Sequence, residues 1–165
     1  MKRKRSFRSA QAGFSLIELL IVVAIIAILA TVAVPRLMDS LKAGRESAAI
    51  QTLHTVHSGQ ATYQATKQRF GTLKELSEIG QLDSNYASGN PVSGYIYTSA
   101  AEVTQDKYCV QATRQASSTA SKDFNVIEDG TVRFVESKSP SPIPHGEGTP
   151  LAGAGASAGA GTGAK

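Results

Sequence analysis

The sequence predicts an α+β protein: a long N-terminal helix, membrane-spanning in its first half, packed on a small antiparallel sheet and followed by a disordered C-terminal tail. Three observations lead to this prediction. An apolar run near the N-terminus gives way to an amphipathic pattern, short β-type runs separated by turn residues follow, and the end of the chain is rich in Pro, Gly and Ala. At 165 residues we expect one small core.

The first half of the helix is predicted by an unbroken apolar composition. Residues 14–34 are apolar except for Ser15, Glu18 and Thr31. About twenty-one residues rising about 1.5 Å each reach roughly 31 Å, which matches a hydrocarbon core of about 30 Å. Pro35 stands where this run stops, and there we expect a kink or local break rather than a firm end of the helix.

The second half of the helix is predicted by a two-faced pattern over residues 36–69. The apolar face is expected to hold Leu41, Ala49, Leu53, Val56, Tyr63 and, at its end, Phe70. The polar face is expected to hold Lys42, Arg45, Glu46, Gln51, Gln60 and Lys67. Together the two halves predict one helix over residues 15–68.

A short helix and several strands should follow. Thr72 and Glu75 have the spacing of a capping box and predict a short helix that stops at Gly80, whereas residues 84–94 are rich in turn formers and predict a loop. Strand-like runs occupy residues 95–98, 108–112, 124–127 and 132–135. Asp129-Gly130 should supply the positive φ angles of a tight hairpin, which gives an antiparallel sheet of three or four strands.

The C-terminal segment, residues 137–165, is predicted to be disordered. It loses its aromatic residues, gains four prolines and ends in an Ala- and Gly-rich run: Pro140, Pro142, Pro144 and Pro150 precede that run. Such a composition has too little apolar bulk to offset the entropy lost on ordering. The sequence thus divides into residues 1–13, 14–35, 36–136 and 137–165.

Charge is distributed unevenly along the chain. The net charge is +4, but five basic residues lie in the first 13, which hold no acid: Lys2, Arg3, Lys4, Arg5 and Arg8. From Phe14 onward, 12 basic residues accompany 13 acidic ones, so the body is almost neutral. We therefore expect no nucleic-acid partner, and we interpret the basic cluster as a topology signal kept on the cytoplasmic side of a membrane.

The stretch Ala-Gly-Phe-Ser-Leu-Ile-Glu-Leu-Leu, residues 12–20, and its continuation to Pro35 resemble the leader and first helix of type IV pilins and of type II secretion pseudopilins. The resemblance covers about residues 8–36. It implies that Gly13 precedes the bond cut by a prepilin peptidase and that Phe14 becomes the N-methylated first residue of a structural, non-enzymatic protein. Residues 1–13 would then be the prepilin leader and residues 36–136 a pilin-like globular domain.

The same resemblance assigns Glu18 a role in assembly. An acid in the middle of a membrane span costs about 2.5–3.5 kcal/mol, so it needs a partner. In the family, the N-terminal amine of Phe14 on a neighbouring subunit supplies one and sets the axial register of the filament. The alternative for Glu18 is an interfacial acid favoured by the dipole of its own helix. For Gly13 the alternative is a linker glycine, and for Pro35 it is an ordinary helix kink.

Two departures from the family pattern stand out. Ala27 takes the place of a glycine at which the helix is thought to loosen during assembly, and alanine is the strongest helix former. Cys109 is the single cysteine, so the disulfide that closes the C-terminal loop in many pilins cannot form. We expect Cys109 to be a small buried strand residue and the sheet edge to be held by packing and the Asp129-Gly130 hairpin.

No other motif indicates an enzyme, a cofactor or a metal site. His54 and His57 lie three apart on the helix, but a solvated or groove-facing pair is the simpler interpretation. Asp123, Glu128 and Asp129 lack the ligand spacing of a calcium site, and turn chemistry accounts for them. Phosphate loops, nucleophile elbows and zinc signatures are missing from the sequence.

The resemblance implies a precursor in the inner membrane that joins a pilus or a periplasm-spanning filament. Its expected partners are further copies and related pilins, the prepilin peptidase, the assembly machinery and membrane lipid. A secretion pseudopilin is one alternative, and the pattern leaves open motility, adhesion, DNA uptake or secretion. Another class is an envelope binding protein, either membrane-anchored or carrying a conventional signal peptide cut after Ala33, although Glu18 and the length of the apolar run argue against the signal peptide.

Overall fold

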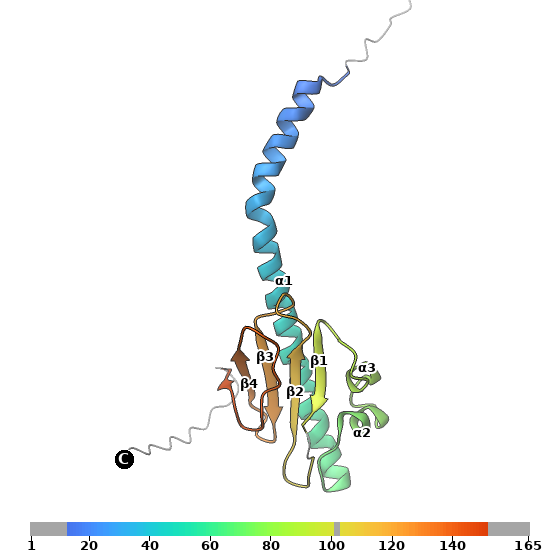
Figure 1. Ribbon diagram of the computed structural model, residues 1–165. Helices are drawn as coiled ribbons and strands as arrows, with labels where there is room; N and C mark the ends of the chain where they lie inside the picture. Colours follow the sequence, from blue (N-terminus) through green and yellow to red (C-terminus); the bar gives the residue numbers. More distant parts are fainter. Residues whose placement is uncertain (1–12, 101–102, 152–165) are drawn as a thin grey trace, which may run out of the picture. The chain divides into compact units, whose positions relative to one another are not determined.

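The computed structural model describes residues 13–100 and 103–151 and divides the chain into two compact units, Met1–Asp39 and Ser40–Lys165. Helix α1 contributes residues to both units (Figure 1). In chain order the elements are α1 (Leu16–Lys67), α2 (Leu73–Glu78), α3 (Ser84–Ala87), β1 (Tyr95–Ser99), β2 (Cys109–Arg114), β3 (Lys122–Ile127), β4 (Val132–Glu136) and β5 (Thr149–Pro150). The predicted helix over residues 15–68 is therefore confirmed to within one residue at each end.

In the first unit, α1 is apolar around its whole circumference. Every residue from 13 to 39 is exposed, including the large apolar side chains. The helix continues through Pro35, so the expected break is not seen. Proline nevertheless removes the N–H that would bond the carbonyl of Thr31, and a change of direction at Pro35 stays a prediction.

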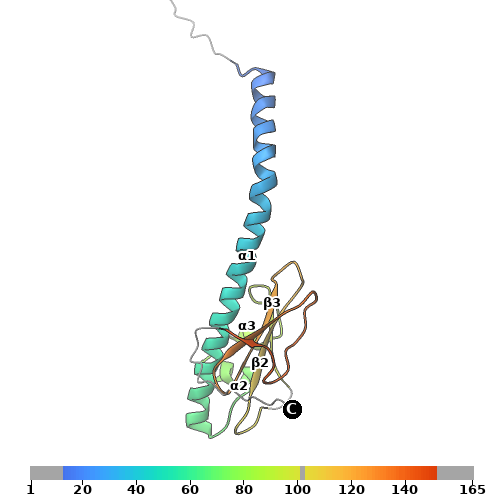
Figure 2. The same ribbon diagram turned by 90° about the vertical axis from the view of Figure 1, so that its left-hand side faces the viewer.

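In the second unit, the remainder of α1 covers one face of the sheet, as Figure 2 shows. Ala49, Leu53, Val56 and Tyr63 are buried, which confirms the predicted apolar face over this stretch. Leu41 differs, because its side chain is 46% exposed. It precedes the first buried helical residue, Ala49, by about two turns, roughly 12 Å along the axis, and so lies before the stretch that meets the core.

The predicted polar face is wrong at Gln60, which is fully buried. Position 60 follows Val56 by four residues and precedes Tyr63 by three, so helical periodicity places it on the apolar face. Its amide is satisfied there, since Nε2 donates to the Gly71 carbonyl at 2.6 Å and Oε1 accepts from the Gly71 N–H at 2.9 Å. Gln60 thereby fixes the chain where it leaves α1.

Two further polar-face residues hold the loop between β2 and β3. Arg45 donates from Nη1 to the Thr119 carbonyl at 3.1 Å, and the Glu46 carboxylate accepts from the Ser121 N–H at 2.9 Å. Glu46 also lies 3.9 Å from the Lys122 ammonium. These half-buried side chains attach the loop to α1 and are not part of a fully solvated face.

The sheet is antiparallel with strand order β1-β2-β3-β4-β5, one strand more than expected (Figure 1). Its helix-facing side carries the cross-strand pairs Val110↔Val126 and Ala112↔Phe124, all buried in the core. The period-2 alternation of these strands explains this, because every second side chain meets α1. The helix-on-sheet α+β architecture predicted from the sequence is confirmed.

The turn between β3 and β4 differs from the tight hairpin expected of Asp129-Gly130. Only Gly130 has a positive φ, at 72°, and its N–H donates to the Ile127 carbonyl at 3.0 Å. The Asp129 carboxylate accepts from the Thr131 N–H at 2.8 Å. A single left-handed residue suits this longer connection, whereas a two-residue type I′ turn would need two.

The connection from α1 to β1 contains one predicted and one unpredicted helix. The capping box of α2 is present, with the Glu75 N–H donating to Thr72 Oγ1 at 3.3 Å and the Thr72 N–H donating to Glu75 Oε2 at 2.8 Å. The expected loop over residues 84–94 begins instead with α3. Asp83 caps it by accepting from the Asn85 N–H at 2.8 Å, so the turn former acts here as a helix start.

Residues 137–151, which the sequence assigned to the disordered tail, belong to the folded domain. Ile143 is buried, and β5 pairs with Arg133 and Phe134 of β4. The Leu151 N–H then donates to the Val132 carbonyl at 3.0 Å. The composition of the tail as a whole does not predict this order. Two apolar residues, Ile143 and Leu151, and a few main-chain hydrogen bonds are enough to order a segment that lies on an existing sheet. Residues 152–165, the remainder of the predicted tail, lie outside the described residues.

Candidate assembly site in the N-terminal segment

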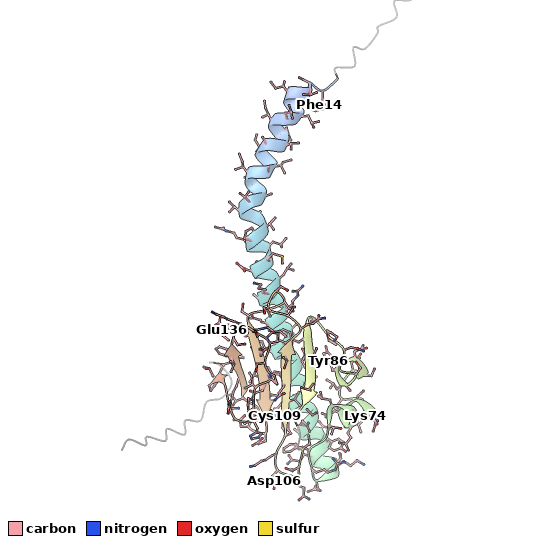
Figure 3. The ribbon with its side chains drawn as sticks, in the orientation of Figure 1. Phe14, Lys74, Tyr86, Asp106, Cys109 and Glu136 are labelled. Atoms are coloured by element: carbon pink, nitrogen blue, oxygen red, sulfur yellow. The ribbon has the colours of Figure 1, made fainter. Side chains whose placement is uncertain are left out.

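The first residues of the described chain are open to solvent. Phe14 is 85% exposed, and a Cβ placed on Gly13 would have no heavy atom within 4 Å. Figure 3 shows the side chains of this part of α1 projecting outward, with Phe14 labelled at its start. No other described part of the chain therefore covers the bond between Gly13 and Phe14.

Glu18 lies in the first turn of α1, and its side chain is exposed. Its Oε2 is 3.5 Å from the N–H of Ser15, the residue that precedes the helix. This spacing is half of a capping box, and the helix dipole adds a favourable field for the carboxylate. Because a 3.5 Å contact is at the limit of a hydrogen bond, the carboxylate can accept a stronger donor.

The structure places two of the predicted site residues at the N-terminal end of α1 and the third far along the helix. Phe14 precedes α1 by two residues, and Glu18 lies in its first turn. Pro35 follows Glu18 by about seventeen residues, roughly 26 Å along a helix. The N-terminal pair thus forms one candidate site, and Pro35 marks the far end of the apolar segment.

Within the described residues, α1 is the one helix long and apolar enough to cross a membrane. None of its membrane-length apolar window is covered by other parts of the chain. Between Leu16 and Met38, fifteen large apolar side chains are exposed. Keeping them in water would be costly, at roughly 25 cal/mol for each Å² of apolar surface. The segment therefore needs lipid or other helices around it.

The two helical histidines have different surroundings. His54 is exposed, whereas His57 Nδ1 is hydrogen-bonded to the Tyr108 hydroxyl at 2.7 Å. Burial raises the pKa of the Tyr108 phenol, so this hydroxyl stays protonated. Over residues 13–100 and 103–151, no group of three or more His, Cys, Asp or Glu side chains is arranged to hold a metal ion.

The three acids considered for calcium each have a basic partner. Asp129 pairs with Arg133, and Glu128 Oε2 lies 2.8 Å from His145 Nε2. Asp123 is buried 3.8 Å from Nη2 of Arg114, which is also buried. These pairs give the carboxylates a structural explanation.

The pair Arg114–Asp123 anchors the segment that follows β4, and sequence reasoning did not single it out. Arg114 Nη2 donates to the Ser137 carbonyl at 2.6 Å and to its hydroxyl at 2.9 Å. The Ser141 N–H donates to Asp123 Oδ2 at 3.1 Å. The sequence did contain a signal for this pair. Arg114 is the single charged residue of β2, and the acid Asp123 lies at the start of β3.

Two amides on the sheet face away from α1 hold the next part of this segment. Gln111 Nε2 donates to the Ile143 carbonyl at 2.7 Å, and Asn125 Nδ2 donates to the Pro144 carbonyl at 3.0 Å. Gln111 and Asn125 are cross-strand partners, so they present a paired platform. Residues 137–147, called the strap below, are thus held without a disulfide.

The single cysteine is a buried strand residue. Cys109 is buried at the start of β2, opposite Ile127, as the sequence predicted. Burial raises the pKa of its thiol to about 11. The thiol is accordingly a packing group, and the sheet is held by noncovalent contacts as expected.

Comparison with known proteins identifies the N-terminal segment. Residues 8–34 match the family described as the prokaryotic N-terminal methylation motif. Over 78 residues the chain is 36% identical to the type IV major pilin protein PilA of Myxococcus xanthus (strain DK1622), an alignment that covers 47% of this chain. It spans 34%, about a third, of that pilin's length. With the long apolar helix followed by a small antiparallel sheet, these findings support the type IV pilin family for this chain, a type IV pilin-like protein with the N-terminal methylation motif.

Proposed function

We propose that this chain is the structural subunit of a type IV pilus or a closely related filament and is made as a membrane-held precursor. The observation that carries the proposal is an apolar helix whose side chains over residues 14–38 are all exposed and which begins with one carboxylate, Glu18. Lipid covers such a surface in the precursor, and the same helices of other copies cover it in a filament.

Processing is the first step. A prepilin peptidase cuts between Gly13 and Phe14 and removes residues 1–13 with their basic cluster, and Phe14 is then methylated on its new amine. The match over residues 8–34 and the open space around Gly13 support this step. Removal of the basic leader is needed because five charges that face the cytoplasm cannot follow the helix into an apolar filament core.

Assembly then pairs Glu18 with the Phe14 amine of a neighbouring copy. The long contact between Glu18 and the Ser15 N–H leaves the carboxylate able to take a cationic donor. A charge-assisted hydrogen bond is roughly twice as strong as a neutral one, and the surrounding apolar helices raise the cost of leaving either charge unpaired. The pairing therefore sets the axial position of each incoming copy.

Substitution of Glu18 tests this mechanism. Glu18→Gln keeps the shape of the side chain but removes its charge, whereas Glu18→Asp keeps the charge on a shorter side chain. We expect the Gln variant to accumulate in the inner membrane and to be absent from filaments sheared off the cell surface, with the Asp variant partly retained. Normal filaments from the Gln variant would contradict the pairing.

The pseudopilin alternative predicts a different location for the product. A pilus subunit should be the main component of sheared surface material, whereas a pseudopilin should stay in the envelope as part of a secretion machine. Fractionation of cells expressing the unaltered chain separates the two, and it does so independently of the Glu18 variants.

A further inference from the structure

The outer edge of β1 lies beside α2 and α3, and part of its main chain is left unbonded by the described residues. Hydrogen bonds at both ends of the β1–β2 ladder fix its phase: the Ala100 N–H donates to the Cys109 carbonyl at 2.8 Å, and the Gln115 N–H donates to the Gly94 carbonyl at 2.9 Å. In an antiparallel pair the bonded residues alternate, so the main-chain groups of Tyr97 and Ser99 point away from β2.

The outward groups of Tyr97 and Ser99 have no hydrogen-bond partner among the described residues. Tyr95, the previous outward residue, does have one, because its N–H and C=O both bond Val92, at 3.0 and 2.8 Å. Two peptide groups, each with a donor and an acceptor, are therefore available along this edge. An added strand would use both, since they are two residues apart and match its repeat.

A groove lies along this edge. It has a volume of about 360 Å³ and is lined by residues 72–74 at the start of α2, residues 87–89 at the end of α3, and residues 97–99 of β1. Figure 3 labels Lys74 and Tyr86 on this side of the sheet, beside β1. Besides Lys74, the lining carries no charge, and Ala87 and Gly89 contribute little side-chain bulk.

The two edges of the sheet are treated differently. The edge of β4 is covered by β5, which ends in Pro150, a residue without an N–H. Strand edges are usually guarded by charges, proline or a covering segment. Residues 97–99 have neither a charge nor a proline, and α2 and α3 flank this edge without bonding the outward main-chain groups of Tyr97 and Ser99. An open edge beside a groove is the arrangement by which proteins take up an extended peptide as an extra strand.

We propose that this groove binds residues 152–165 of a second copy of the chain, paired as a strand with the outward groups of Tyr97 and Ser99. The first ten residues of that segment alternate strictly, because every even position from 152 to 160 is alanine and every odd position from 153 to 161 is glycine or serine. Successive side chains of a strand point to opposite faces. One face of such a strand would therefore carry only glycines and one serine, and it could lie close to the groove wall.

A second copy suits the groove better than the segment of the same chain. Fourteen residues span at most about 46 Å in strand geometry, whereas the edges of a five-stranded sheet are about 19 Å apart, so length is not the obstacle. The obstacle is the path, since α1 covers one face of the sheet and the strap lies on the other. A neighbouring copy can reach the groove without crossing either face.

Amide hydrogen exchange of the full chain in detergent micelles tests the proposal. As protein concentration rises, exchange at Tyr97 and Ser99 should slow at least tenfold. The variant Ala156→Pro/Ala160→Pro, which removes N–H groups from the segment, should lose this effect. The matched variant Ala156→Ser/Ala160→Ser, which keeps them, should retain it.

Three results would overturn the proposal: no slowing, slowing that is independent of concentration and so indicates the segment of the same chain, or equal slowing in the proline variant. On the β1 side, Ser99→Pro removes an outward N–H, whereas Ser99→Ala leaves it in place, so only the former should abolish the slowing. The inference does not depend on the proposed filament function. Glu18→Gln should leave the exchange result unchanged even if it blocks filament formation.

Discussion

Removal of Asp123 should loosen the strap and destabilise the domain. Its Oδ1 accepts from the Arg114 N–H at 2.8 Å, its Oδ2 accepts from the Ser141 N–H at 3.1 Å, and its carboxylate is the negative charge next to the buried Arg114 guanidinium. Asp123→Ala therefore leaves two N–H groups without partners and the buried guanidinium without a counter-charge. Ser121 and Ser137 still accept from the guanidinium, but neither supplies a charge.

The expected cost is large relative to the stability of a small domain. Breaking a buried ion pair by removing one partner costs about 3–5 kcal/mol, out of a total of about 5–15 kcal/mol. Replacing both charges is cheaper than replacing one, because no buried charge then remains. We expect Arg114→Met/Asp123→Ala to lose less stability than the two single variants combined.

Urea unfolding of the full chain in detergent measures this change. The chain has five tyrosines and no tryptophan. All five tyrosines follow residue 60, so near-ultraviolet circular dichroism reports on the second unit and not on the membrane segment. Asp106→Ala, an exposed acid, is the matched control and should change the free energy of unfolding by less than about 0.5 kcal/mol. An Asp123→Ala variant within about 1 kcal/mol of the parent would refute this reasoning.

Two further predictions concern buried and acidic groups. Gln60→Leu should cost about 1–3 kcal/mol for each of the two Gly71 main-chain groups that lose a partner, measured by the same urea assay, and an unchanged midpoint would contradict that role. The hydrogen bond from Arg69 lowers the pKa of Glu75 to about 2, from 4.5. Because the native carboxylate binds a proton less readily than the unfolded one, its contribution is present above about pH 5 and is lost as pH falls towards 2. Glu75→Gln should reduce the fall in urea midpoint between pH 5 and pH 2, and an equal fall in both proteins would exclude this pair as a cause.

Local patterns in the sequence were enough to predict most of the elements. The apolar run and its amphipathic continuation predicted α1, because helix periodicity is read within a few turns. The Thr72 and Glu75 capping box predicted α2 for the same reason, since both of its bonds join residues three apart. Four strands were found within one or two residues of their bounds from β-type composition and turn residues.

The features that were missed depend on contacts between distant parts of the chain. Gln60 is buried because its amide hydrogen-bonds the main chain of Gly71, beyond the end of α1. Ile143 is ordered because Gln111 and Asn125 donate hydrogen bonds to the main chain of its segment. Composition averages cannot detect one anchoring residue in a proline-rich segment. Asp83 was missed for another reason. Aspartate is common both in turns and at helix N-caps, and its residue type alone does not show which of the two it forms.

The candidate site was predictable from the sequence for a different reason. Gly13, Phe14 and Glu18 belong to a short linear motif, so their spacing alone made them visible. Their expected partners are a protease and a second copy of the chain, and neither lies within one folded subunit. Their roles therefore stay predictions, whereas the position of Glu18 in the first turn of α1 is a feature of the structure.

The identity of the first residue of the mature protein tests the central claim most directly. We predict that mass spectrometry of the chain recovered from cells that carry a prepilin peptidase will give an N-terminal peptide that begins with N-methylated Phe14, and that deleting the peptidase will restore the leader. A mature chain that still begins with Met1 and its basic cluster would contradict the account.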